Sequence, residues 1–405
     1  MNHQHDTVRT PDLATLRLAM RVLFFAMGSV FGSWASRIPD VKRALSLSDG
    51  ALGLALFAGP AGEFCAVAVT ALVIRRIGSK AVMVMGLPLY GATLALVGAA
   101  SSFAWLALAL FGFGFACNYY NIALNAQAVA VEVMHGRPVM SSFHGMWSLG
   151  GVAGGIAGSA AASLGVPPAW HFLAAAAAAT AAALLLSGRI LQQDPPRKTQ
   201  GQASRRRGRL ASPGAFILLL GFIAFANMAT EGTMYDWSAV YFAQVVQPAE
   251  HLVRAGFVAC MCAMVTGRFL GDRLVARFGP VRVLQAGGVF VACGIVLACL
   301  RPSVLWSTAG FALVGLGMSP AIPLCYSLTA KSRRVEPSVG ISLISTIGFF
   351  GILCSPALTG FLAECFGLRS ALLPLAAMGA GIVVLAPLLP KAEACQEDAK
   401  RTAER

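Results

Sequence analysis

Two acidic residues lie within an otherwise apolar run, and they are the strongest candidates for chemistry. Glu231 and Asp236 occur in "EGTMYDWSAVYF", which directly follows "PGAFILLLGFIAFANMAT". An ionised carboxylate that faces lipid is costly, so such an acid is expected to face a cavity or a partner. A carboxyl group shielded from water can gain and lose a proton near neutral pH, as a coupling group must. The alternatives are a structural ion pair for Glu231, for example with Arg37, and an interfacial position for Asp236.

A third acid and a row of amides also lie in apolar surroundings. Glu63 occurs in "GPAGEF", where a functional and a structural role are equally open. Asn118, Asn121 and Asn125 follow i, i+3, i+7 spacing and therefore share one face of a helix. Amides both donate and accept hydrogen bonds, so this face, with the ring and hydroxyl of Tyr120, suits a hydroxyl-rich ligand. The alternative is hydrogen bonding between helices.

Three aromatic residues complete the candidates for solute contact or coupling. The rings of Trp34 and Trp237 could stack on a sugar-like solute, although anchoring at a membrane surface also explains them. His144, in "FHGMWSLGG", titrates in the physiological range or braces a gate. The ten cysteines are scattered without the spacing of a zinc site or a disulfide framework, so neither a metal nor a cofactor is expected.

Composition indicates the environment of these residues. Hydrophobic residues make up 57% of the chain and charged residues 12%, against about 25% charged in a soluble domain. The net charge of +14 is compatible with nucleic acid or with a membrane, and the recurring long apolar runs favour the membrane and exclude nucleic acid. The sequence contains no "HExxH", "GxSxG" or phosphate-binding "GxxxxGK[ST]", which argues against an enzyme and against an ATP-driven pump.

Hydropathy predicts an all-α membrane protein with twelve spans in two six-helix bundles. The spans are expected near 17–39, 48–74, 80–101, 103–131, 139–164, 168–190, 213–243, 252–275, 281–301, 303–330, 338–363 and 368–390. The predicted domains are an N-terminal segment 1–16, a bundle 17–190, a basic linker 191–212, a second bundle 213–390 and a tail 391–405. With the N-terminus inside, 24 lysines and arginines fall on the cytoplasmic side and 6 on the other, which predicts that both termini are cytoplasmic.

The two bundles are expected to be related by duplication. Three pairs of segments match in the same order at offsets of 203, 203 and 201 residues, and they pair Trp34 with Trp237. The pairs are "GSWASRIP" with "YDWSAVYF", "FGFGFA" with "VGLGMS", and "RRIGSKAV" with "ARFGPVRV". Paired six-helix halves are typical of secondary transporters, whose solute site lies between the halves near mid-membrane.

One stretch resembles a family motif. "GRFLGDRLVARFGPVRVL" (267–284) is similar to the cytoplasmic gating loop of the major facilitator superfamily. The matching positions are Gly271, Asp272, Arg273, Arg277, Gly279 and Arg282. In that family the loop braces the closed cytoplasmic face through salt bridges. This chain departs from the motif in a longer spacing between the acid and the second glycine, and in Ala71 at the position of the acid in the first half.

Within that superfamily the chain resembles the bacterial branch related to the fucose permease. The resemblance is carried by "GSWASRIPDVKRALSLSDGALGLALF", "SSFHGMWSLGG" and "EGTMYDWSAVYF". It implies a monomeric, proton-coupled carrier of a small, sugar-like solute in the bacterial inner membrane. Asn121 occupies the place of the acid that such sugar carriers use in the fourth span, so coupling through that span is not expected. Proton-driven efflux of drug-like compounds or metabolites is the alternative, and a non-transporting sensor is a further one.

Overall fold

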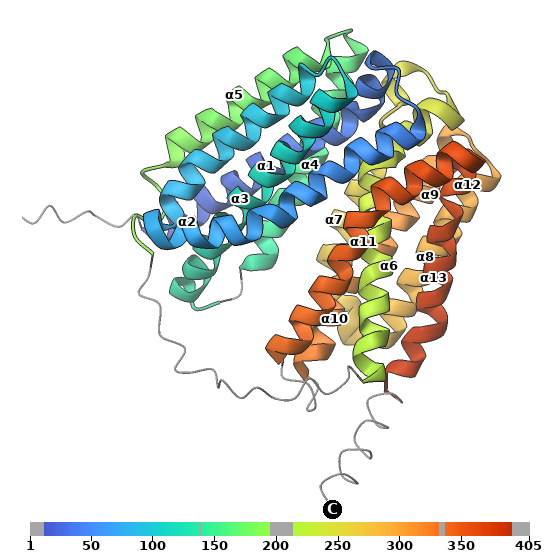
Figure 1. Cartoon of the computed structure of the whole chain (residues 1–405). Coiled ribbons are helices and arrows are strands. Elements are labelled where there is room, and N and C mark those ends of the chain that lie inside the picture. The colour runs from blue at the N-terminus through green and yellow to red at the C-terminus, as the bar shows by residue number, and fades with distance from the viewer. Residues whose placement is uncertain (1–11, 138, 195–213, 332–336, 391–405) are drawn as a thin grey trace, which may run out of the picture. The chain divides into compact units, whose positions relative to one another are not determined.

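The structure of the chain is a computed structural model that describes residues 12–137, 139–194, 214–331 and 337–390 (Figure 1). These residues form helices joined by short connections, and no strand occurs among them. The predicted tail 391–405, nearly all of the predicted linker 191–212 and most of the segment 1–16 lie outside the described residues. The helical fold follows from the long apolar runs, because a helix satisfies its own backbone hydrogen bonds within lipid.

The α-helices are α1 Leu13–Ala44, α2 Asp49–Gly98, α3 Phe103–His135, α4 Met140–Ser163, α5 Pro168–Leu186, α6 Ala215–Tyr241, α7 Ala255–Phe278, α8 Pro280–Leu300, α9 Val304–Met318, α10 Ala321–Lys331, α11 Pro337–Phe366, α12 Leu368–Ala371 and α13 Leu373–Leu385. Short π- and 3₁₀-helical turns are η1 Phe242–Val246, η2 Glu250–Leu252 and η3 Ala386–Leu388.

The described residues supply the twelve predicted spans. Ten helical stretches are long and apolar enough to cross a membrane. One of them, α2, has 50 residues and bends at Gly78, so it provides two spans, since about 20 residues suffice for one. The 24-residue helix α4 provides the remaining span. The tenth span is broken between α9 and α10 at Pro320.

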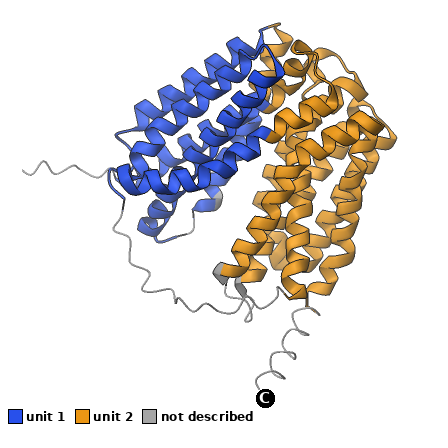
Figure 2. Ribbon diagram, viewed as in Figure 1, with its two compact units in different colours: residues 1–34, 58–154, 166–203 blue, residues 35–57, 155–165, 204–405 orange. Residues whose placement is uncertain are grey.

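The chain divides into two compact units (Figure 2). Unit 1 comprises residues 1–34, 58–154 and 166–203, and unit 2 comprises residues 35–57, 155–165 and 204–405. The second unit therefore contains the helices of the second half together with three short ends of α1, α2 and α4. The core of the second unit includes buried apolar side chains from α6, α8 and α10, among them Leu220, Leu284 and Cys325.

The two halves share backbone details, at an offset of 201 residues. Gly78 (φ 81°, ψ 161°) and Gly279 (φ 80°, ψ 159°) adopt the same left-handed turn. Ser102 and Ser303 both accept a hydrogen bond from the backbone N–H of a tryptophan three residues later. Both pairs are 201 residues apart, which is the offset that the sequence gives for "RRIGSKAV" and "ARFGPVRV".

Close contacts of glycines with neighbouring helices show how the first span aligns with the seventh. A Cβ atom on Gly150 would lie 2.1 Å from the carbonyl oxygen of Phe25, and one on Gly351 would lie 2.4 Å from that of Phe225. The glycine of this contact recurs 201 residues later in the sequence, and the phenylalanine recurs 200 residues later. The predicted offset of 203 for the first and seventh spans is therefore wrong. Trp237 corresponds to Arg37 rather than to Trp34, because the match rested on a single shared tryptophan.

The match between the fourth and tenth spans is also wrong by two residues. A Cβ atom on Gly114 would lie 1.9 Å from the carbonyl oxygen of Gly59, and one on Gly315 would lie 2.2 Å from that of Cys260. Both members of this contact recur at an offset of 201. The alternating glycines of "FGFGFA" and "VGLGMS" allow either register in the sequence, and the helix contact selects one.

Candidate functional site

Glu231 lies in the middle of α6 and pairs with a cation inside the membrane spans. Its Oε1 is 3.5 Å from Nη2 of Arg268 on α7 and accepts a hydrogen bond of 2.5 Å from the hydroxyl of Tyr235, one turn further along α6. The Tyr235 hydroxyl also lies 3.7 Å from the sulfur of Met264. The partner of Glu231 is thus Arg268, which is itself within a predicted span, and not the suggested Arg37.

The pair is partly accessible. The side chain of Glu231 is 13% exposed and that of Arg268 is 30% exposed. Gly232 does not interrupt α6: a Cβ atom there would lie 2.6 Å from Oγ of Ser355, so this glycine permits α11 to approach.

Two further polar residues share the face of α6 that carries Glu231. Asn227 and Ser238 lie four residues before and seven residues after Glu231, which places all three on one side of a helix with 3.6 residues per turn. Asn227 is 3% exposed and Ser238 is fully buried. Neither Nδ2 of Asn227 nor Oγ of Ser238 has a hydrogen-bond partner among the residues that the structure describes. Buried polar groups are normally satisfied, so these two are suited to bind a solute or water.

The other candidates on α6 lie further along the same helix. Asp236 is half-buried. Trp237 is fully buried in the second unit, with no hydrogen-bond partner for its indole N–H within the described ranges. Trp237 is therefore neither an interfacial anchor nor an exposed stacking surface, because packing encloses the whole ring.

The asparagine row on α3 is occupied by contacts within the first unit. Nδ2 of Asn118 donates to the backbone carbonyl of Glu63 at 2.8 Å, which joins α3 to α2. Nδ2 of Asn125 donates to the side-chain oxygen of Asn121 at 2.7 Å. Tyr120 is buried, with its hydroxyl 3.5 Å from the carbonyl oxygen of Leu23. The structure thus brings Glu63 and Asn118 together, as it does Asn121 and Asn125.

Trp34 and His144 lie in different surroundings. Trp34 is buried, and its ring centroid is 6.3 Å from those of Phe113 and Phe172. His144 is exposed on α4 and packs edge-on against Phe24 at 5.3 Å. The interfacial alternative for Trp34 is therefore wrong, because its ring belongs to the packed core of the first unit.

A cavity of about 570 Å³ lies in the first unit at the turn after Gly78. Ser79, Lys80 and Asp194 line it, and Asp194 accepts hydrogen bonds from both the backbone N–H and the hydroxyl of Ser79. Gln127 donates to the Ser79 hydroxyl at 3.0 Å. This internal bonding ties the turn to its neighbours, and it explains the buried amide of Gln127 without a ligand.

The predicted gating loop is mostly helical. Gly271, Asp272, Arg273 and Arg277 lie in α7, which continues to Phe278, and Arg282 lies in α8. Gly279 alone makes the turn. Gly271 is helical, with nothing within 4 Å of an added Cβ atom, so it does not form a turn. The guanidinium of Arg277 lies over the ring of Phe278, 5.3 Å from its centroid. The side chain of Asp272 is not among the described parts of the structure.

The chain is similar to known membrane proteins along nearly its whole length. It is 31% identical to an uncharacterised MFS-type transporter of Yersinia pestis over 91% of this chain and 94% of that protein. It is 33% identical to the uncharacterised transporter y4wD of Sinorhizobium fredii, over 90% of this chain and 96% of that protein. It is 29% identical to the membrane protein MosC of Rhizobium meliloti, over 89% of this chain and 87% of that protein.

Solved structures share the fold. A point mutant of the nucleoside transporter NupG superimposes with a TM-score of 0.73 at 14% identity, over 93% of this chain and 99% of NupG. A bacterial homologue of the human lysosomal transporter Spinster, inward-facing and unoccupied, gives a TM-score of 0.65 at 15% identity, over 96% of this chain and 97% of that one. The profile of the Major Facilitator Superfamily matches residues 19–336 and 250–405. With the twelve spans, these matches show that the chain is a multi-pass membrane transporter, not an enzyme, and belongs to the major facilitator superfamily.

Proposed function

We propose that the protein is a proton-coupled secondary transporter of a small polar solute, in which Glu231 carries the proton. The observation that carries this proposal is the pair of Glu231 and Arg268 inside the spans. Ionisable residues at such depth are rare, and they typically mark solute pathways or proton relays. Tyr235 and Arg268 both donate to the same carboxylate oxygen of Glu231, so this oxygen links α6 to α7.

Protonation of Glu231 changes the charge of this site. The ionised carboxylate attracts Arg268 and accepts from Tyr235, whereas the neutral carboxyl group loses the charge-based part of both contacts. Arg268 remains charged in either state, because a guanidinium does not deprotonate in proteins. Proton binding therefore loosens the link between α6 and α7, and a solute bound beside Glu231 experiences a different charge in the two states.

The solute is proposed to contact Asn227 and Ser238. An amide N–H and a hydroxyl that are buried without partners in the described part of the chain select for a ligand with hydrogen-bond acceptors, such as hydroxyl or carbonyl oxygens. Sugars and nucleosides both meet this requirement. Nucleosides are a sensible first probe because NupG, a nucleoside transporter, shares the fold. Asn118, Asn121 and His144 remain proposals for further contacts.

The basic residues and the family support several further proposals. We place the protein in the inner membrane of a bacterium, with both termini and the basic linker 191–212 in the cytoplasm and the segments 17–190 and 213–390 as its two bundles. We also propose that it works as a monomer by alternating access, with the residues from Gly271 to Arg282 at the cytoplasmic gate.

The test is proton movement driven by solute. Purified protein in vesicles that contain a pH-sensitive dye is exposed to a panel of sugars, nucleosides, amino acids and drug-like compounds. A solute that changes the internal pH only in vesicles with protein supports the proposal, and the sign of the change distinguishes import with protons from proton-driven efflux. Transport of a solute without any proton movement would contradict it.

A further inference from the structure

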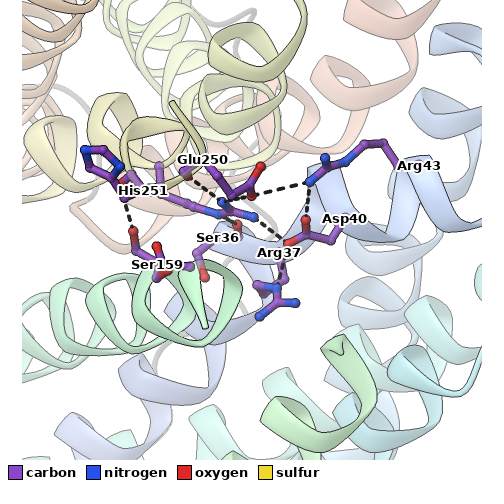
Figure 3. Close-up of polar contacts among 9 residues, drawn as sticks. Ser36, Arg37, Asp40, Arg43, Ser159, Glu250 and His251 are labelled. Atoms are coloured by element: carbon purple, nitrogen blue, oxygen red, sulfur yellow. Dashed lines mark hydrogen bonds and ion pairs between the residues drawn. The ribbon is translucent and has the colours of Figure 1, made fainter. Parts of the chain in front are cut away.

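A fully buried arginine, Arg254, joins two helices of the second unit, and Figure 3 labels its partners Ser36, Asp40 and Glu250. Arg254, at the start of α7, donates from Nη2 to Oδ2 of Asp40 at 2.6 Å and from Nε to the carbonyl oxygen of Ser36 at 3.1 Å. Asp40 and Ser36 both lie on α1. Nη1 of Arg254 donates to Oε1 of Glu250 at 2.6 Å. The guanidinium thus has acceptors on each of its nitrogens, which is how a buried charge is tolerated.

Asp40 forms ion pairs with three arginines of this cluster. Besides Arg254 it binds Nε of Arg37 at 2.6 Å and Nη2 of Arg43 at 2.6 Å. Its side chain is 12% exposed, whereas that of Arg43 is 59% exposed. Arg43 also reaches Glu250, at 3.5 Å. The Arg254–Asp40 pair is therefore the shielded part of the cluster, and Arg43 forms its solvated rim.

A second joint at the same end is made without charge pairs. Gly53 of α2 and Gly360 of α11 touch so closely that a Cβ atom on Gly53 would lie 2.6 Å from the carbonyl oxygen of Pro356. The backbone N–H of Gly50 donates to Glu364 at 2.9 Å. Residues 35–57 come from the first half of the sequence, yet they pack here on helices of the second half.

The position of these joints has a consequence for transport. Residues 35–44 and 49–57 are the ends of α1 and α2, whose remaining parts belong to the first unit. If the halves rock against each other, the ends of α1 and α2 must separate from α7 and α11 whenever the path opens at this end. The contacts of Arg254 cross that line of separation.

We propose that Arg254 is the latch of this end: its bonds to Asp40 and Ser36 hold α1 on α7 in the closed state, and each transport cycle must break them. The latch is a positioning device rather than a solute site. It rests on alternating access but not on Glu231 or on proton coupling, so its test requires no solute. Breaking the latch exposes a charge that is fully shielded in the closed state, which makes Arg254 and Asp40 the residues that set how often this end opens.

The test is the reactivity of a cysteine behind the latch. Ser36, whose side chain is fully buried, is replaced by cysteine in a full-length background without the ten native cysteines. The purified protein in detergent reacts with a water-soluble maleimide, so membrane sidedness does not enter. Arg254→Gln is expected to raise the labelling rate about tenfold or more, because it removes the buried ion pair that joins Asp40 of α1 to α7. Arg43→Gln, with the same loss of charge at the rim, should change the rate less than about twofold.

A second variant distinguishes loss of the Arg254–Asp40 bond from misfolding of the Arg254→Gln protein. Asp40→Asn keeps the size of the side chain and is expected to accelerate labelling at least as much as Arg254→Gln, because it removes the counter-charge of three arginines. The double variant Asp40→Asn/Arg254→Gln should label no faster than either single variant, since both act on one bond. Equal labelling in Arg254→Gln, Asp40→Asn and Arg43→Gln, each with a sharp melting transition, would overturn the proposal. So would strictly multiplicative effects in the double variant.

Discussion

Nη2 of Arg268 lies 3.5 Å from Oε1 of Glu231, and this contact joins α7 to α6 within the spans of the second half. The same carboxylate oxygen accepts from Tyr235. An acid with both a cation and a hydroxyl at one oxygen has two states that differ in charge and in the strength of a link between helices.

Removal of the cation should impair transport more than its replacement by lysine. Arg268→Gln leaves Glu231 without its ion pair, so we expect proton-coupled uptake to fall at least about tenfold, while Arg268→Lys retains a measurable fraction. The pair is partly exposed, so the loss of unfolding free energy should be on the order of 1–2 kcal/mol, less than for a fully buried pair. Uptake and thermal melting are measured on the same preparations. Wild-type uptake in Arg268→Gln would contradict the role of the pair.

Asn227 should contribute to solute affinity without contributing to stability. Its amide has no partner in the described part of the chain, so Asn227→Ala removes no internal hydrogen bond and should leave the melting temperature unchanged or slightly raised. Loss of one hydrogen bond to the solute should weaken binding about fivefold to tenfold. Thr230→Ala is the control, because the hydroxyl of Thr230 bonds to the carbonyl of Ala226 in its own helix. Equal affinity in wild type and Asn227→Ala, by calorimetry, would remove Asn227 from the site.

The turn at Gly279 should not tolerate a side chain. Its φ of 80° and ψ of 159° fall in a region that is essentially restricted to glycine. No atom lies within 4 Å of an added Cβ, so the expected loss of about 1–3 kcal/mol from Gly279→Ala comes from the backbone alone. Gly271→Ala, in the open but helical position, should be neutral or slightly stabilising. Similar melting temperatures for the two variants would show that the turn adapts.

Single cysteines should report the orientation of the chain. We expect a cysteine at position 204, in the predicted linker, to react with a membrane-impermeant maleimide only in inside-out vesicles. A cysteine at position 302, between the ninth and tenth spans, should react only in the opposite vesicles. These outcomes follow from the excess of lysine and arginine on one side of the predicted spans. Reaction of the linker in right-side-out vesicles would reverse the proposed topology.

The sequence was sufficient for the fold because its signals are local and strong. Long apolar runs, punctuated by glycine, proline and charge, predict the spans, and the turns at Gly78 and Gly279 lie where the two halves were matched. Register was less predictable, since a shared tryptophan or a pair of glycines fits several offsets. Contacts between helices, such as those of Gly150 with Phe25 and of Gly351 with Phe225, select the correct offset.

Partners in space were harder to predict than positions along the chain. Glu231 lies 37 residues from Arg268, and Asp40 lies 214 residues from Arg254, and no pattern of spacing connects residues so far apart. Arg268 could have been suspected, because it is a charged residue within a predicted span. Asn227 was missed because one asparagine in an apolar helix has no neighbour that marks it, and its lack of a partner among the described residues is a property of the packing.

The most direct test of the central claim compares two neutralised acids on α6. Glu231→Gln and Asp236→Asn are reconstituted separately, and both net uptake driven by a pH gradient and counterflow exchange at equal pH are measured for the transported solute. The account predicts that Glu231→Gln loses gradient-driven uptake but retains exchange, because only the proton-carrying step is removed, whereas Asp236→Asn retains both. Gradient-driven uptake in Glu231→Gln with the wild-type pH dependence would contradict the assignment of Glu231 as the proton carrier.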